Sequence, residues 1–199
     1  MDDSILCRFS DLAKRADRTG RFQFTPFLGL EEQSVLQEHR RELWPFSLSG
    51  GVEGCERVVA RFGDPEAFGY EEPYPIVTVR IAPVLQKFAD QLTHRDFLGA
   101  LMNLGIEREL WGDILLRDNV ACLFVLDTMA GYVCDNLQKV KHTVVKCEIV
   151  SDVPAGDLFK TEEVFLTAAS ARLDCLIAGV FDLPRSQTMK KKKKKKVYV

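Results

Sequence analysis

Hydrophobic positions along the chain follow two periods, and each period predicts one kind of element. Apolar residues spaced three and four apart form one face of an amphipathic helix, and such spacing predicts helices at 4–19, 31–42, 94–104, 127–137 and 168–180. Short runs rich in β-branched residues predict strands, and they fall at 74–82, 113–116, 120–125, 143–150 and, less regularly, 160–165. Residues 43–46 look extended, residues 55–62 suit either a strand or a helix, and another element begins at 183–186.

Local signals mark where several of these elements begin and end. Thr93 followed by Asp96 has the pattern of a helix N-cap, and Gly105 is well placed to end the same helix. The Gly-rich residues 49–54 and the triplet 117–119 are typical of turns. The middle of the chain therefore has the most clearly bounded elements.

The order of these elements predicts the fold. Between residues 74 and 152 the order is β-α-β-β-α-β, which is the arrangement of ferredoxin-like and RRM-like domains, with two helices on one face of a four-stranded antiparallel sheet. Gly and Pro residues at 64–74 mark a boundary before it. We therefore expect an α+β protein with a small N-terminal domain of helices and strands at 1–73, an RRM-like domain at 74–152 and a third unit at 160–199.

An RRM-like sheet raises the possibility of RNA binding, because RRM domains stack bases on aromatic side chains of the open sheet face. Here Phe124 is the only aromatic residue in the two central strands, and the usual closely spaced aromatic and basic residues are absent. The pattern supports the fold more firmly than it supports RNA binding in the RRM manner.

Charge is unevenly distributed along the chain. Seven lysines run from Lys190 to Lys196, and without them the 27 basic residues fall to 20 against 29 acidic ones, so the first 189 residues carry a net charge of −9. Acidic surfaces suit protein partners better than phosphate, which favours a protein partner for the N-terminal part. No apolar run approaches the roughly 18 residues of a membrane span, and the N-terminus lacks the apolar core of a signal peptide, so we expect a cytoplasmic protein without membrane contact.

Familiar catalytic and metal-binding patterns are missing from the sequence. The three histidines, at 39, 94 and 142, do not pair at metal-ligand spacing, and the six cysteines are at least 12 residues apart. Such spacing is typical of free thiols in a reducing compartment rather than of a zinc or redox site. The glycines at 50, 51 and 54 are not followed by the Lys-Ser/Thr of a phosphate loop. We expect no metal and no cofactor.

Four segments resemble a known family. ARLDCLIAGVFDLPRS (171–186) resembles the opening of the small RNA-binding domain named after ribosomal protein S4. LTHRDFLGALMNLGIERELWGDIL (92–115) is similar to the central domain of the bacterial YlmH-type proteins, which carry such an S4-like domain last. SGGVEGCER (49–57) and TPFLGLEEQ (25–33) look like the first domain of that family. The resemblance spans nearly the whole chain, and 92–115 is its most specific part.

This resemblance implies a cytoplasmic, non-enzymatic RNA-binding protein. The family is associated with the large ribosomal subunit, with ribosomal and transfer RNA and with the rescue of stalled nascent chains, and its genes often lie near cell-division genes. In an S4-like unit two short helices form a basic surface, and Arg guanidinium groups suit bidentate phosphate binding. The RNA-binding candidates implied for this chain are Arg172, Arg185, Ser186, Gln187, Lys190 and Lys196.

The lysine run departs from the family pattern, which has an apolar inner helix face and a Gly at this place. Three interpretations stay open: a basic segment that strengthens RNA binding, a solvated tail, or a stand-in for unassigned residues. Lysines cannot pack a helix against apolar residues without burying ammonium groups, which favours the last interpretation. The S4-like unit is expected to be truncated at Val199.

Two other functions compete with RNA binding. Pseudouridine synthases can carry S4-like domains and use an RLD motif, which would make Asp174 a catalytic nucleophile. However, their S4-like unit is usually N-terminal, and the residues after Asp174 lack the Thr/Ser-Gly signature, so the motif lacks its structural context. The other alternative is a protein–protein adaptor linked to cell division, which would use the acidic N-terminal part.

Overall fold

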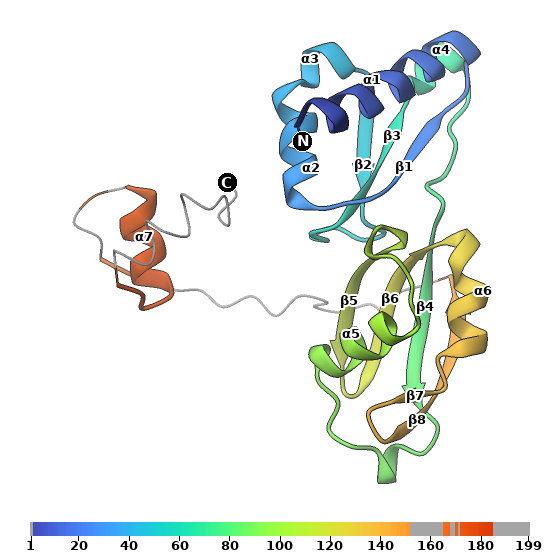
Figure 1. Ribbon diagram of the computed structural model, residues 1–199, viewed down its shortest axis with the longest axis vertical. Helices are drawn as coiled ribbons and strands as arrows, with labels where there is room; N and C mark the ends of the chain where they lie inside the picture. Colours follow the sequence, from blue (N-terminus) through green and yellow to red (C-terminus); the bar gives the residue numbers. More distant parts are fainter. Residues whose placement is uncertain (1, 152–164, 168–169, 171, 185–199) are drawn as a thin grey trace. The chain divides into compact units, whose positions relative to one another are not determined.

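A computed structural model of the chain describes residues 2–151, 165–167, 170 and 172–184 (Figure 1). The chain divides into two compact units, residues 1–159 and residues 160–199, and each is described by itself. The mixture of helices and antiparallel strands confirms the predicted α+β class. Within the described residues, no helix combines the length and apolar character needed to cross a membrane.

The N-terminal part of the first unit is a small antiparallel sheet covered by helices. Its three strands, β1 (Gln23–Leu28), β2 (Phe46–Ser49) and β3 (Val58–Phe62), lie in the order β1-β3-β2. The helices are α1 (Asp2–Thr19), α2 (Leu30–Glu38), α3 (Arg40–Leu43) and the short α4 (Pro65–Phe68). Their core includes Phe9, Leu36, Leu43 and Phe62, each at most 2% exposed.

This region shows where the periodicity was informative and where it was not. The helix predicted at 4–19 is confirmed, and residues 55–62 contain a strand. The single helix predicted at 31–42 is wrong, because His39 (φ −99°, ψ 20°) leaves the helical conformation and separates α2 from α3. Leu43, expected to be extended, ends α3. Strand β1 was not predicted because it contains Pro26, which the pairing with β3 accommodates by a register shift between Phe24 and Phe27.

The central part has the predicted β-α-β-β-α-β order. Its elements are β4 (Ile76–Pro83), α5 (His94–Asn103), β5 (Trp111–Arg117), β6 (Val120–Leu126), α6 (Asp127–Asn136) and β8 (Thr143–Val150). Two 3-10 turns (Gln86–Phe88 and Arg108–Leu110) and the two-residue strand β7 (Lys139–Val140) add to this plan. The antiparallel sheet has the order β5-β6-β4-β8-β7, as a ferredoxin-like domain with one extra edge strand requires.

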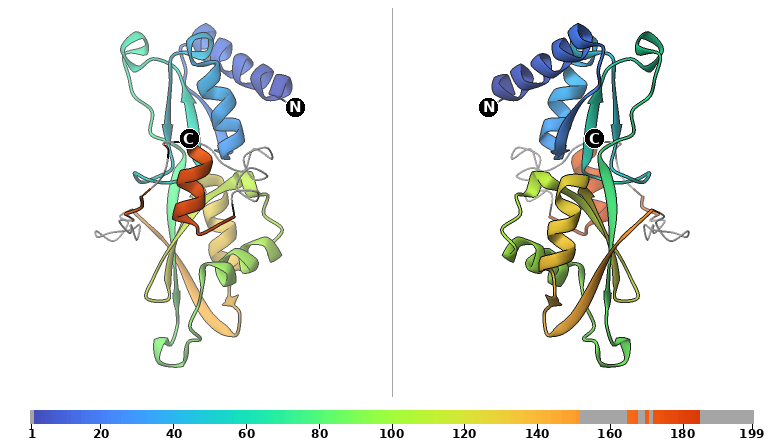
Figure 2. Two further views of the ribbon diagram at one scale, coloured as in Figure 1. Left: turned by 90° about the vertical axis from the view of Figure 1, so that its left-hand side faces the viewer. Right: turned by 90° about the vertical axis from the view of Figure 1, so that its right-hand side faces the viewer.

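Both helices cover the same face of the central sheet (Figure 2). Val79, Ile81 and Leu123 point into the core beneath them, and Phe97 of α5 and Val133 of α6 close it. The predicted cap of α5 is confirmed, since the Asp96 carboxylate accepts hydrogen bonds from the Thr93 N–H (2.8 Å) and hydroxyl (2.7 Å). Gly105 follows the helix at φ +71°, a conformation that favours glycine.

In the second unit, the structure describes one helix, α7 (Leu173–Val180). The helix predicted from residue 168 starts later, because Arg172 is extended (φ −74°, ψ 136°) and occupies the N-cap position. Phe165 lies in no regular element, and residues 160–164 of the predicted strand lie outside the described residues. So do residues 185–199, including the lysine run.

Candidate nucleic-acid interface

The face of the central sheet away from α5 and α6 is the open face of this fold. Alternate residues of each strand reach it: Thr78, Arg80 and Ala82 come from β4, and Cys122 and Phe124 come from β6. Within the strand pairing, Arg80 stands opposite Cys122, and Thr78 stands opposite Phe124. This is the face on which RRM domains bind RNA.

Half of this face is covered by the N-terminal part of the same unit. Leu115, Cys122 and Phe124 form one buried cluster with Phe27 of β1 and with β3. Gly51, in the loop between β2 and β3, lies so close that an added Cβ would be 2.5 Å from the Phe124 ring. The backbone of Gly51 has φ +103°, which L side chains rarely adopt. The only aromatic side chain of the two central strands is therefore 1% exposed and unavailable for base stacking.

Three of the four sequence segments that carry the family resemblance meet at this covered half. Phe27 belongs to 25–33, Gly51 and Glu56 to 49–57, and Gly112 and Asp113 to 92–115. A Cβ on Gly112 would lie 2.5 Å from the Phe27 ring, and the Glu56 N–H donates to the Asp113 carboxylate at 2.5 Å. These segments thus form one contact between the N-terminal and central parts.

Two arginines hold this contact together. The Arg57 guanidinium donates to the Phe27 carbonyl (2.7 Å) and the Arg108 carbonyl (3.2 Å). That of Arg108 donates to the carbonyls of Trp111 (2.8 Å) and Gly112 (3.1 Å) and lies 3.6 Å from the centre of the Trp111 ring. Burial lowers the pKa of both groups, and burial together with the nearby Arg57 charge brings the pKa of Arg108 to about 10. Both stay protonated at neutral pH and bind backbone rather than phosphate.

The other half of the open face is accessible and carries cations. The side chains of Arg80, Arg117 and Lys146 are 40%, 68% and 71% exposed. Three small apolar residues separate them on the same face. We call the three cations, the apolar residues between them and the neighbouring Glu148 the uncovered face. Its residues are Arg80, Ala82, Arg117, Val120, Val144, Lys146 and Glu148.

Two carboxylates lie beside these cations, since Asp118 is 3.8 Å from the Arg117 guanidinium and Glu148 lies between Lys146 and Arg80. Glu148 accepts a 2.6 Å hydrogen bond from the Lys146 ammonium group and lies 3.7 Å from the Arg80 guanidinium. The bond from Lys146 and its charge lower the pKa of Glu148, so the carboxylate is ionised at neutral pH. Three cations and two carboxylates leave a surface with a small net positive charge and no aromatic side chain. Such a surface suits phosphate oxygens, whose contacts carry little sequence information.

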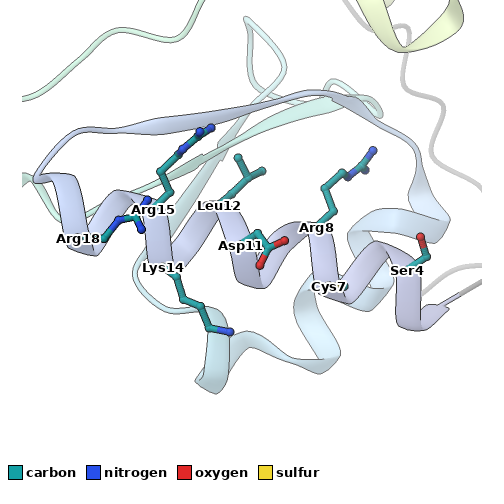
Figure 3. Close-up of a pocket in the computed structure, with 8 residues that line it drawn as sticks. All are labelled: Ser4, Cys7, Arg8, Asp11, Leu12, Lys14, Arg15 and Arg18. Carbon is teal, nitrogen blue, oxygen red and sulfur yellow. The ribbon is translucent and has the colours of Figure 1, made fainter.

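A third group of cations lies on α1, where Arg8, Lys14, Arg15 and Arg18 line the pocket shown in Figure 3. Asp11 lies between them on the same helix, and Arg8 is bound to Glu32 of α2 at 2.6 Å. These carboxylates offset part of the positive charge. The α1 surface is therefore the weaker candidate for phosphate binding.

Of the residues predicted from the S4-like resemblance, Arg172 is the one that the structure describes. Arg172 is exposed at the N-cap of α7, where its carbonyl accepts from the N–H groups of Cys175 (2.9 Å) and Leu176 (3.1 Å). Residues 185–187, Lys190 and Lys196 lie outside the described residues. In the part of the chain that the structure describes, no cluster of His, Cys, Asp or Glu is arranged to hold a metal ion.

Sequence reasoning missed the cations of the uncovered face. A signal was present, since Arg80 alternates with buried Val79 and Ile81 in a predicted strand, and such alternation predicts two different sheet faces. Arg117 and Lys146 join Arg80 only through the strand register, because they are distant in the sequence.

Comparison with known proteins places this chain among RNA-binding proteins. A family model described as a putative RNA-binding domain in YlmH matches residues 70–152, which include the whole central sheet. Ribosome-associated protein quality control protein P2 of Bacillus subtilis (strain 168) is 30% identical over 182 residues, covering 86% of this chain and 67% of that protein. The solved structure of cell division protein YlmH from Streptococcus pneumoniae superposes with a TM-score of 0.57 at 25% identity, over 75% of this chain and 90% of that one.

Proposed function

Since the chain belongs to the YlmH family, we propose that it is a non-enzymatic RNA-binding protein and that its uncovered face contacts RNA phosphates. Its place of action is the ribosome in the cytoplasm, as the name of the B. subtilis relative suggests. The finer parts of the proposal are ribosomal or transfer RNA at the large subunit as the target, and translation quality control as the process.

One observation carries the proposal. Within the segment matched by the RNA-binding model, the sheet face that RRM domains use is half closed by Gly51 and Phe27, and its open half presents three cations. Because Phe124 is buried, base stacking is excluded there, and contacts to the RNA backbone take its place. Such contacts depend strongly on salt.

A second contact belongs to the proposal, at the C-terminal unit. The RNA-binding candidates there are Arg172, Arg185, Ser186, Gln187, Lys190 and Lys196. The proposal also retains three domains, at residues 1–73, 74–152 and 160–199. Arg172 is exposed at the start of a helix, which is compatible with this role. Two separate contacts would raise the affinity of each through a high effective concentration.

The uncovered face is tested with the full chain and a single-stranded RNA of about 20 nucleotides, a length that exceeds common single-domain site sizes. The double variant R117Q/K146Q removes the two most exposed cations, and K14Q/R15Q on α1 is the matched control with the same charge change. Removing one phosphate contact lowers the slope of log affinity against log salt by about 0.7, so we expect a slope lower by about 1.4 for R117Q/K146Q. Equal slopes for the two variants would contradict the proposal.

The proposed binding to the large ribosomal subunit needs a separate measurement. Co-sedimentation with purified large subunits across a salt series is compared for the unchanged chain, R117Q/K146Q and R172A. We expect salt-sensitive association that both variants weaken, because each removes one of two linked contacts. Association that is insensitive to salt and to both changes would instead favour a protein-binding adaptor.

A further inference from the structure

A groove lies on the helix side of the central sheet and is not part of the proposed uncovered-face contact. It is an open depression along α5, bordered by the end of α6 and the segment leading into β7, with a volume of about 700 Å³. Its lining includes three cations and three amide side chains. They are Arg95, Lys139, Lys141, Asn103, Asn136 and Gln138.

The cations of this groove are less neutralised than those of the uncovered face. Within the described part of the chain, none of Arg95, Lys139 and Lys141 takes part in an ion pair, whereas Arg80 and Lys146 share Glu148. Asp96 also lines the groove, where its carboxylate accepts two hydrogen bonds from Thr93 and offsets part of the charge of Lys141 and Arg95. The groove therefore keeps a positive balance and unpaired donors for an anion.

The amide groups suit a ligand that also offers hydroxyl groups and base edges. Asn136 uses one of its two amide hydrogens on the Tyr132 carbonyl (2.8 Å), which leaves the other hydrogen and the oxygen for a ligand. Amides both donate and accept, as ribose hydroxyls and bases require. Phosphate contacts from the cations and polar contacts from the amides together fit a single RNA strand.

Gly99 is one of the residues that line the groove. It lies inside α5, where glycine is less favourable than alanine by about 1 kcal/mol. An added Cβ would meet no atom within 4 Å, so packing does not require glycine here. A larger side chain can be introduced at this position without a clash, which makes Gly99 a useful point of obstruction.

The groove is continuous with the uncovered face at the edge of the sheet. Lys139 of β7 lines the groove and stands directly opposite Val144 of β8 in the ladder. Residues directly opposite in a ladder share one face, and Val144 belongs to the uncovered face. From β5 to β7 the sheet is about 20 Å wide, at roughly 4.8 Å per strand, so one RNA strand can contact both surfaces.

We propose that the α5–β7 groove is a second RNA contact, and that a single RNA strand passes from the uncovered face around the β8–β7 edge into it. This inference rests on the proposed function, because it extends the same RNA beyond the uncovered face. The ligand is single-stranded RNA, held by phosphate contacts to Arg95, Lys139 and Lys141.

The test compares two groove variants with the uncovered-face variant, in the full chain. R95Q/K141Q removes two groove cations, and G99Q obstructs the groove without changing charge. R117Q/K146Q reports on the uncovered face, and K14Q/R15Q on α1 is the control. Binding is measured with single-stranded RNAs of about 5 and about 20 nucleotides, which lie near the lower end of common site sizes and beyond their upper end. Thermal unfolding confirms that each variant is folded.

For the longer RNA we expect R95Q/K141Q to weaken binding by about tenfold at low salt and to lower the salt slope by about 1.4. G99Q should weaken binding of the longer RNA by severalfold, while its thermal transition stays at least as high as that of the unchanged chain, because glutamine is a better helix former than glycine. The 5-nucleotide RNA, which has fewer phosphates than the six cations of the two surfaces, should lack the full advantage that the longer RNA has from binding two surfaces at once.

The outcomes separate the two proposals. If only R117Q/K146Q weakens the longer RNA, the groove inference is overturned and the uncovered face stands. If only the groove variants weaken it, the groove binds RNA but the shared path and the proposed role of the uncovered face are both wrong. If no variant differs from the control, both proposals fail.

Discussion

The two halves of one sheet face in the central domain have opposite characters. In the covered half, Leu115 and Phe124 are buried against β1 and β3. In the uncovered half, Arg117 and Lys146 are more than two-thirds exposed. Leu115 and Arg117 are two positions apart on the same strand, a distance of about 7 Å. Over that distance the face changes from a packing surface to a surface available for a ligand.

This difference shows that a shared fold does not carry a shared binding mode. An RRM uses the centre of its open face for stacked bases, and the same centre here is filled by Gly51 over the Phe124 ring. The N-terminal part thus acts as a permanent cover. The surface that stays accessible to RNA is the uncovered face, where Arg80, Arg117 and Lys146 lie. Function has to be argued from the accessible side chains.

The largest effect is expected from a substitution that disrupts the packing of the N-terminal part on the central sheet. Phe124→Ala removes a fully buried ring beneath Gly51 and Phe27, and Phe→Ala changes in cores cost about 3–5 kcal/mol. We expect the free energy of unfolding in urea to fall by about that amount. The RNA affinity of the folded variant should change by less than about twofold, because the truncation removes no charge from the uncovered face.

Phe124→Leu is the matched control, since it keeps an apolar side chain in the cluster. It should cost less than half as much as Phe124→Ala. A Phe124→Ala protein as stable as the unchanged chain would show that the N-terminal part does not pack on this half of the sheet.

A smaller loss of stability is expected from removing one arginine of the contact. Arg108→Met keeps much of the side-chain volume but leaves the carbonyls of Trp111 and Gly112 without their donor and removes the guanidinium from the Trp111 ring. Charged hydrogen bonds and stacked cations of this kind contribute about 2–3 kcal/mol together. Urea unfolding measures the loss, and tryptophan fluorescence, compared with that of a Trp44→Phe background, reports the local change at Trp111.

Arg108→Lys serves as the comparison, because lysine keeps the charge but cannot bridge two carbonyls with one planar group. If charge alone mattered, Arg108→Lys would restore full stability. We expect it to recover only part of the loss, since an ammonium group lacks the planar guanidinium that lies 3.6 Å from the centre of the Trp111 ring.

The sequence was sufficient for the central domain because its signals are local. Strand β8 was predicted at its observed bounds, and the Thr93–Asp96 cap has the expected hydrogen bonds. The turn at 117–119 contains Asp118 and Asn119 at positive φ, a conformation that these residues tolerate. Local spacing and turn chemistry determine all of these features.

The N-terminal part was less predictable because tertiary packing decides it. Pro26 breaks the periodicity of β1, yet the strand forms because its pairing with β3 absorbs a register shift. The break between α2 and α3 at His39 carries no Gly or Pro signal. Gly51 was recognised as part of a turn, but its approach to Phe124 joins residues 73 positions apart and has no local signature.

The candidate site was missed for a related reason. Sequence reasoning placed RNA binding at residues 172–196, where basic residues are contiguous or match a motif. The cations of the uncovered face come from β4, β5 and β8 and meet only when the strands pair in the observed register. The sequence alone predicts that RRM-type aromatic contacts are absent. It does not indicate that Phe124 is buried beneath the loop that contains Gly51.

The smallest expected effect concerns the uncovered half of the sheet face. Glu148 is the carboxylate that contacts both Arg80 and Lys146 on the uncovered face, so Glu148→Gln should raise the affinity for single-stranded RNA by about two- to fivefold, the range that exposed ion pairs support. The bond from Lys146 lowers the pKa of Glu148, and its stabilising effect is present at neutral pH and lost only as the pH falls through that lowered value. The gain should therefore be equal at pH 6 and pH 7.5, when filter binding is measured beside Glu38→Gln, an exposed carboxylate on α2. An equal gain from Glu38→Gln would mean that net charge, rather than the uncovered face, sets RNA affinity.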